Sequence, residues 1–267
     1  MIDLHCHIIP GVDDGAESLE ESIEMAKIAE EERIEKIVAT PHLFRGDLNS
    51  GDFPMVEEKR QELCRALKDH NIQLEILPGA EVHISHDLIE EIRKNREKLV
   101  LNHSSYMLIE FPADHVYAGA KNLLFELMSE GLTPIIAHPE RNNVFVHNPR
   151  QLYELVSMGA LSQANSGSFF GLYGRSVREA ALSFLKLNLT HFIASDCHSP
   201  RSRAPRLTEA VNRAGEEIGK KNAGFLVRKN PQAVVEDRAI PYLPEPINPK
   251  EKEKSFKIRI PDIFKRQ

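Results

Sequence analysis

Short apolar runs alternate with amphipathic stretches along most of this chain, and this alternation constrains its fold more than any other feature. Seven apolar runs are typical of buried strands, at residues 2–5, 36–40, 73–81, 106–111, 133–138, 161–165 and 191–196. Seven stretches have helical periodicity, at residues 18–33, 54–71, 85–94, 116–130, 149–158, 176–187 and 204–221. Strands and helices in strict alternation predict an α/β fold with a parallel sheet.

The arrangement of that sheet is indicated by chain length and by the first turn. A chain of 267 residues fits one large domain, and α/β barrels often reach this size undivided. No glycine-rich phosphate loop follows the first strand, which disfavours an open doubly wound sheet. We therefore expect a closed or nearly closed barrel over residues 1–239.

The last stretch, residues 240–267, differs in composition and is expected to be a separate tail. It contains Pro241, Pro244, Pro246 and Pro249, then a mixed-charge run at 250–254 and scattered apolar residues among basic ones. One interpretation is a tail that wraps over the domain or is disordered. The other is a docking segment for a partner or a second subunit, so a homo-oligomer is also considered.

Charge and cysteine content exclude several classes of protein. The net charge of −6 (34 basic against 40 acidic residues) predicts no nucleic-acid partner, since such proteins usually carry a basic surplus. No segment reaches the ~18 apolar residues that a membrane helix needs, and the first residues do not match a secretory signal. Three cysteines, Cys6, Cys64 and Cys197, are too few for a disulfide framework and favour a cytoplasmic location.

Potential metal ligands follow nearly every predicted strand, at the end where active sites of parallel α/β folds lie. These residues are His5, His7, His42, Glu81, Glu110, His138, Asp196 and His198. Two pairs have i, i+2 spacing, His5 with His7 and Asp196 with His198, so the members of each pair can project to one side of a strand. One histidine alone would be interpreted as structural, but two such pairs beside strand-end carboxylates indicate a metal site.

Two further features lie next to these strand ends. The acidic, glycine-bounded loop 11–15 holds Asp13 and Asp14, which could bring a carboxylate to a cation or simply form a turn. Arginines follow two ligand-bearing strand ends: Arg141 after His138, and Arg201, Arg203 and Arg206 after His198. Arginine suits phosphate because its guanidinium donates two parallel hydrogen bonds. The remaining histidines keep a structural interpretation: His70, His83, His86, His103, His115, His147 and His191.

Taken in order, these residues form a set of motifs that resembles a known superfamily. They are D-L-H-C-H at 3–7, D-D-G at 13–15, P-H at 41–42, G-A-E at 79–81, I-E-F at 109–111, A-H-P-E-R at 137–141 and S-D-C-H at 195–198. The pattern resembles the polymerase-and-histidinol-phosphatase (PHP) superfamily, and in particular its bacterial branch of capsule-biosynthesis tyrosine-protein phosphatases. The resemblance covers residue 1 to about 237 and leaves the tail outside.

The resemblance implies a distorted (βα)7 TIM-like barrel that holds about three divalent metal ions, commonly Mn²⁺, with iron or zinc also compatible with the ligands. Its implied ligand sets are His5, His7, Glu81 and Asp196 for one ion; Glu81, Glu110 and His138 for a second; and Asp14, His42 and His198 for a third. Arg141 and Arg203 match the positions that hold substrate phosphate. The implied activity is hydrolysis of protein phosphotyrosine by metal-generated hydroxide, with a bacterial tyrosine autokinase of polysaccharide synthesis as the expected substrate.

Several alternatives stay open at this point. Cys197 and Arg203 have the C-x5-R spacing of cysteine-dependent tyrosine phosphatases, although the intervening segment lacks the glycines of a phosphate-binding loop. A small-molecule phosphatase, such as histidinol-phosphate phosphatase, would use the same ligands. A non-catalytic metal-binding regulatory domain and a nuclease or polymerase-associated role are the remaining candidates.

Overall fold

The computed structural model describes residues 1–45, 48–85 and 87–249 of the chain. Within these ranges the strands are β1 (Ile2–Cys6), β2 (Lys36–Ala39), β3 (His42–Leu43), β4 (Glu75–Pro78), β5 (Glu81–His83), β6 (Tyr106–Glu110), β7 (Thr133–Ala137), β8 (Leu161–Asn165) and β9 (Phe192–Ala194). All strand pairs between them are parallel, which confirms the predicted α/β class.

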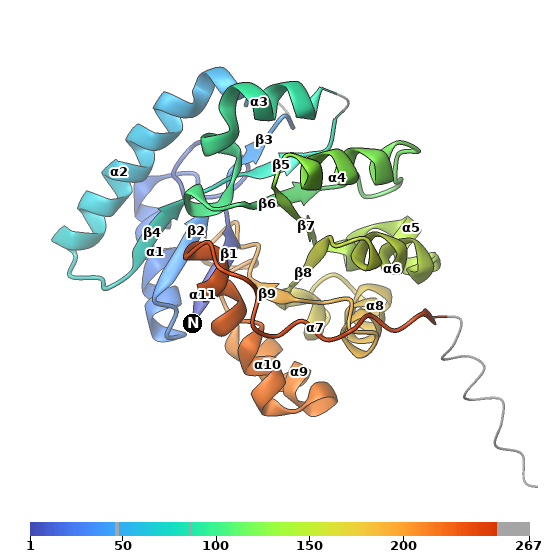
Figure 1. Cartoon of the computed structure of the whole chain (residues 1–267). Helices are drawn as coiled ribbons and strands as arrows, with labels where there is room; N and C mark the ends of the chain where they lie inside the picture. The colour runs from blue at the N-terminus through green and yellow to red at the C-terminus, as the bar shows by residue number, and fades with distance from the viewer. Residues whose placement is uncertain (46–47, 86, 250–267) are drawn as a thin grey trace, which may run out of the picture.

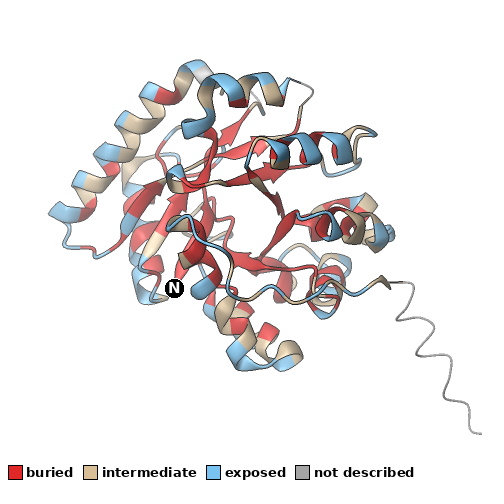
Figure 2. Ribbon diagram, viewed as in Figure 1, coloured by how far each residue is buried: buried red, intermediate tan, exposed pale blue. Residues whose placement is uncertain are grey.

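Helices cover the outside of the strands (Figure 1). The α-helices are α1 (Leu19–Glu31), α2 (Phe53–Asp69), α3 (Leu88–Leu99), α4 (Ala120–Ser129), α5 (Asn143–His147), α6 (Pro149–Ser157), α7 (Ser166–Phe169), α8 (Arg175–Lys186), α9 (Thr208–Ile218), α10 (Lys220–Phe225) and α11 (Lys229–Val235). The described residues also contain three short 3₁₀ helices: η1 (Ser50–Asp52), η2 (Leu101–His103) and η3 (Pro139–Arg141). Figure 2 shows that the strands are buried while the helices expose their outer faces to solvent. No helix in the described ranges is long and apolar enough to span a membrane.

A single closed seven-stranded sheet is not found in the described part of the chain. The strands form two sheets, one in the order β1-β2-β4 and one in the order β3-β5-β6-β7-β8-β9. The run predicted as one strand at 73–81 is interrupted at Gly79 and Ala80, and Pro41 separates β2 from β3. Proline has no N–H to donate to a neighbouring strand, and glycine weakens a strand. Pro41 and Gly79 therefore interrupt the strand pairing between β2 and β3 and between β4 and β5.

The two sheets meet at the edge where the chain begins and the last strand ends. An isolated parallel bridge joins Cys6 to Cys197. Around it, His7 N donates to Cys197 O at 2.9 Å, and Asp196 N donates to His5 O at 2.8 Å. This junction places the segments that follow β1 and β9 side by side, which matters because both carry candidate metal ligands.

The first part of the predicted tail, residues 240–249, lies along the domain. Ile247 N donates to Leu187 O at 2.8 Å, and Asn188 Nδ2 donates to Glu245 O at 2.8 Å. Tyr242 stacks on Phe225 with ring centroids 5.3 Å apart. The mixed-charge run at 250–254 and the apolar and basic residues up to 267, for which a wrapping or docking role was considered, lie outside the described residues.

Candidate metal centre

The nine residues named as metal ligands lie close together, most of them at or just after the carboxyl ends of strands, whereas His42 and Glu81 begin β3 and β5. Their ligand atoms form four overlapping groups in which all atoms lie within 4.8 Å of one another: His7, Asp14, His42 and His198; His5, His7 and Glu81; His5, His138 and Asp196; His42, Glu81 and Glu110. These groups divide the residues differently from the three ligand sets given above. Asp14 is the only exposed member of the groups.

The segment from β1 contributes the two imidazoles at the middle of the cluster. His5 Nε2 and His7 Nε2 are 3.1 Å apart, and both side chains are buried. Glu81 Oε2 lies 3.2 Å from the first nitrogen and 3.4 Å from the second. Asp196 Oδ1 lies 3.4 Å from each of them. Cys6, between the two histidines, is wholly buried in the hydrophobic core.

The outer imidazole nitrogens of this pair have fixed partners. His5 Nδ1 is 2.8 Å from Gln163 Oε1, and His7 Nδ1 is 2.6 Å from Asp13 Oδ2. Burial opposes ionisation of Asp13, but the charge and hydrogen bond of His7 outweigh it and lower the Asp13 pKa to about 2. Such partners orient an imidazole so that its other nitrogen faces a metal. Asp13 and Asp14 therefore have different positions, one behind the imidazole and one in front of the cluster.

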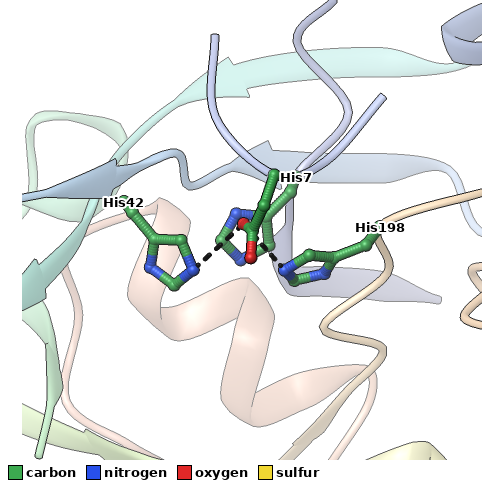
Figure 3. A group of neighbouring side chains, drawn as sticks. His7, His42 and His198 are labelled. Atoms are coloured by element: carbon green, nitrogen blue, oxygen red, sulfur yellow. Dashed lines mark ion pairs between the residues drawn. The ribbon is translucent and has the colours of Figure 1, made fainter. Parts of the chain in front are cut away.

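A second part of the cluster surrounds Asp14. Its Oδ1 lies 3.3 Å from His42 Nε2 and 3.3 Å from His198 Nε2. Hydrogen bonds from those two imidazoles hold the Asp14 pKa far below its usual value. Figure 3 shows His7, His42 and His198 pointing toward one another, from segments that are distant in the sequence. The rings of His7 and His198 are 3.9 Å apart at their centroids.

The third part lies at the ends of β5, β6 and β7. His138 Nε2 is 2.9 Å from Glu81 Oε1 and 4.0 Å from Glu110 Oε1. Two residues not named as site residues also contact Glu110: Arg45 Nη1 donates to Oε1 at 2.8 Å, and His83 Nδ1 lies 3.2 Å from Oε2. His83 follows Glu81 at i+2, so the spacing rule used for the other pairs could have identified it.

The chemistry of these residues fits a divalent cation. His42 Nδ1 and Glu81 Oε2 are buried 2.8 Å apart, within hydrogen-bond distance, yet neither atom has a partner with good hydrogen-bond geometry in the described part of the chain. Buried polar atoms are normally satisfied, and a cation shared by a nitrogen and an oxygen would satisfy both. Imidazole and carboxylate donors suit manganese, iron and zinc.

Arg141 and Arg203 lie at one edge of the cluster, where both contact Asp196. Arg141 Nη1 donates to Asp196 Oδ2 at 2.7 Å, and Arg203 Nη2 approaches the same oxygen at 2.6 Å. Asn165 Nδ2 donates to that oxygen as well, at 2.5 Å. The backbone here is unusual, because Asp196 and His138 have left-handed φ values of 51° and 30°. The guanidinium groups of Arg141 and Arg203 thus meet at Asp196 Oδ2, next to the candidate metal ligands.

An aromatic ring that the sequence analysis did not single out lies against both arginines. The Tyr173 ring centroid is 4.5 Å from Arg141 Cζ and 5.9 Å from Arg203 Cζ, distances typical of cation–π contacts. Tyr173 belongs to the segment between α7 and α8. Tyr173 belongs to none of the motifs, because it lies neither at a predicted strand end nor two residues from another candidate ligand.

Cavities open on two sides of the cluster. One, of about 440 Å³, is lined by Asp14, His198 and Arg203 among others. The other, of about 230 Å³, is lined by Glu110, His138 and Arg141, with apolar walls from residues 111–113. A substrate could thus reach the candidate ligands from solvent.

Cys197 is not accessible to a substrate, as a nucleophilic cysteine would have to be. Its side chain is wholly buried in the hydrophobic core. The guanidinium of Arg203 contacts Asp196, both at the carboxylate and at the backbone oxygen, the latter at 3.0 Å. The C-x5-R spacing therefore lacks the exposed thiolate that cysteine-dependent chemistry needs.

Most of the chain matches the model of one known protein family. The family model described as "Capsular polysaccharide synthesis, CpsB/CapC" matches residues 1–236. Tyrosine-protein phosphatase YwqE of Bacillus subtilis is 38% identical over 256 residues, which cover 96% of this chain and 99% of that protein. Tyrosine-protein phosphatase CpsB of Streptococcus pneumoniae is 33% identical over 247 residues, with 90% and 100% covered.

A third relative and a solved structure agree with these matches. Putative tyrosine-protein phosphatase CapC of Staphylococcus aureus is 41% identical over 212 residues, covering 79% of this chain and 82% of that protein. A crystal structure from work on YwqE of B. subtilis and CpsB of S. pneumoniae, described as metal-dependent tyrosine phosphatases, superposes with a TM-score of 0.88. That chain is 38% identical, and the match covers 93% of this chain and 99% of the other.

Proposed function

This chain belongs to the CpsB/CapC family of capsular polysaccharide synthesis, and on that premise we propose that it is a metal-dependent phosphatase acting on protein phosphotyrosine. The observation that carries the proposal is the cluster of five imidazoles and four carboxylates with two arginines at its edge. A cation cluster beside paired guanidinium groups is suited to a phosphate ester, whose negative oxygens both can bind.

We assign the nine clustered residues to about three divalent ions, most consistent with Mn²⁺. The assignment is supported by the four overlapping groups of ligand atoms and by the unsatisfied pair His42 Nδ1 and Glu81 Oε2. Bound divalent ions would supply an activated water near neutral pH and would neutralise charge on the phosphoryl group. Asp13 and Gln163 would fix the orientation of His7 and His5 toward the ions.

The arginines would bind the phosphoryl oxygens in the transition state. Both are held by Asp196 Oδ2, so their guanidinium groups are positioned before substrate arrives. Preorganised donors of this kind stabilise developing charge without reorganisation during the reaction. This geometry also means that Arg141 and Arg203 connect the phosphate site to a metal ligand.

The substrate class is inferred from the relatives. Those named above are called tyrosine-protein phosphatases, and the family model concerns capsular polysaccharide synthesis. We infer that this chain dephosphorylates a tyrosine kinase that participates in polysaccharide synthesis. The cavity of about 230 Å³ beside Arg141 has a mixed lining, in which the apolar part at residues 111–113 could contact a phenol ring.

A panel of metals and substrates tests the proposal. We expect a chelator to abolish hydrolysis, Mn²⁺ to restore it, and phosphotyrosine peptides to be cleaved far faster than phosphoserine peptides. Asp196→Ala, measured beside the wild-type protein, should lose both metal and activity. A strong preference for histidinol phosphate would support the small-molecule alternative instead, and activity that persists without metal would refute a metal-dependent mechanism.

Three further expectations from the sequence remain proposals. The first is a distorted seven-stranded barrel, supported by the bridge that joins the two sheets at Cys6 and Cys197. The second is the division into a domain at 1–239 and a tail at 240–267. The third is a cytoplasmic location, for which the argument is still the small number of cysteines, all of them free.

A further inference from the structure

Tyr173 occupies the edge of the metal centre where the two arginines converge, and no role has yet been assigned to it. Its ring faces the guanidinium of Arg141 at 4.5 Å and that of Arg203 at 5.9 Å. The segment that carries it, between α7 and α8, also exposes Phe170 and Leu172 to solvent. Tyr173 therefore directs its side chain into the site while neighbouring side chains face outward.

The hydroxyl group of Tyr173 is buried and has no partner with good hydrogen-bond geometry among the described residues. Neither Tyr173 Oη nor Arg203 Nε makes a hydrogen bond to any residue that the structure describes. The pKa of each group nevertheless responds to a hydrogen bond from the other, so the Tyr173 and Arg203 side chains lie close together but in poor hydrogen-bond geometry. Buried polar atoms without well-placed partners are rare, and such a pair beside a candidate active site indicates a position where a polar ligand can bind.

The missing ligand must be an acceptor. Arg203 Nε can only donate, and the Tyr173 hydroxyl remains protonated because burial raises its pKa. The nearby Asp196 Oδ2 already receives Arg141, Arg203 and Asn165, so it has no capacity for another donor. One hydroxyl donor beside two positive guanidinium groups, one of which carries Arg203 Nε, fits an anionic oxygen, as in a phosphoryl group.

We propose that Tyr173 contacts the substrate: its hydroxyl donates a hydrogen bond to a non-bridging oxygen of the phosphoryl group that Arg141 and Arg203 bind. The inference rests on the proposed phosphatase function and adds a third donor to its phosphate site. The ring has a separate effect, because it packs against both guanidinium groups and limits their movement. Phenylalanine would preserve that packing, so the hydroxyl can be tested apart from the ring.

The test compares Tyr173→Phe with the wild-type protein, both loaded with Mn²⁺. Tyr153→Phe is the matched control, since Tyr153 is a half-buried tyrosine on α6 that packs against a hydrophobic cluster. We measure kcat/KM on a phosphotyrosine peptide, the Kd of inorganic phosphate by calorimetry, bound metal and the unfolding temperature. For Y173F we expect kcat/KM to fall about 10- to 100-fold and the phosphate Kd to rise about 3- to 10-fold, with unchanged metal content. Y153F should match the wild type, and Tyr173→Leu should lose more activity than Y173F.

Several results would overturn the inference. If Y173F keeps wild-type kcat/KM and phosphate affinity while Y173L loses them, the ring acts alone and the hydroxyl contact is wrong. If Y173F loses metal or unfolds at a lower temperature, Tyr173 has a structural role. Failure of the proposed function would look different, because the wild type would then not hydrolyse phosphotyrosine. Phosphate binding would still decide the role of Tyr173 in that case, since calorimetry requires no turnover.

Discussion

Replacing Arg203 with alanine separates phosphate binding from metal binding. Arg203 Nη2 forms an ion pair with the Asp196 carboxylate at 2.6 Å and donates a hydrogen bond to the Asp196 backbone oxygen at 3.0 Å. Asp196 keeps Arg141 and Asn165 after the change, so its orientation and its place in the metal cluster should survive. The lost interaction is therefore mainly the one with the phosphoryl group. Removing such a donor typically costs ~2.7–4 kcal/mol in the transition state, or about 100- to 1,000-fold in kcat.

Steady-state kinetics and metal analysis of purified variants test this expectation. Arg203→Lys should rescue poorly, because an ammonium group cannot make two parallel hydrogen bonds. Arg206→Ala is the control, since Arg206 is an exposed arginine three residues away. Near wild-type turnover in Arg203→Ala would refute its phosphate-binding role. Loss of metal from that variant would show instead that Arg203 supports the cation site through Asp196.

Other outcomes follow from residues in and around the site. Cys197→Ser should keep most activity, as measured on a phosphotyrosine peptide, because that buried thiol is not the nucleophile; an inactive variant with normal metal content would contradict this. Gly15→Ala should lower the free energy of unfolding by roughly 1–3 kcal/mol or more, because the new alanine Cβ would lie 2.2 Å from His7 O. Denaturant unfolding measures this change, and an unchanged midpoint would contradict the close packing at Gly15. His191 is buried and accepts a hydrogen bond from Ser162 N, and burial lowers its pKa from 6.5 to about 4. His191 therefore becomes protonated at a higher pH in the unfolded chain than in the folded one. The free energy of unfolding should fall by about 3 kcal/mol as pH falls from 6.5 to 4. His191→Asn should reduce that pH dependence, as measured in unfolding experiments at several pH values.

The α/β class could be predicted from the sequence because strand and helix periodicities alternate clearly. Most candidate ligands were found by one rule, that parallel strands deliver their ends to one edge, and residues as distant as His5 and Asp196 do lie together. Asp14 was named through the family resemblance instead. The sheet pairing could not be predicted in the same way. Whether Pro41 and Gly79 interrupt a strand depends on the neighbouring strand, which periodicity does not describe.

The site residues that could not be predicted from the sequence are mainly those that reach the site through contacts between distant parts of the chain. Arg45 reaches Glu110 from 65 positions away, and Tyr173 reaches Arg141 across a loop. Neither lies at a predicted strand end, so only the folded chain brings them into the cluster. Gln163 shows the same limit, because its contact with His5 links residues 158 positions apart.

The bridge between Cys6 and Cys197 has a consequence for synthesis on the ribosome. Residue 6 is translated 191 residues before residue 197, so the second edge of β1 has no partner until residue 197 is made. At ~5–20 residues per second, that interval is roughly 10–40 s. During this time the nascent chain presents an open strand edge beside His5 and His7, without the acidic residue at 196 that would help to hold a cation. Metal loading would thus follow translation of nearly the whole domain, and a chain that stops before residue 196 would have an incomplete centre.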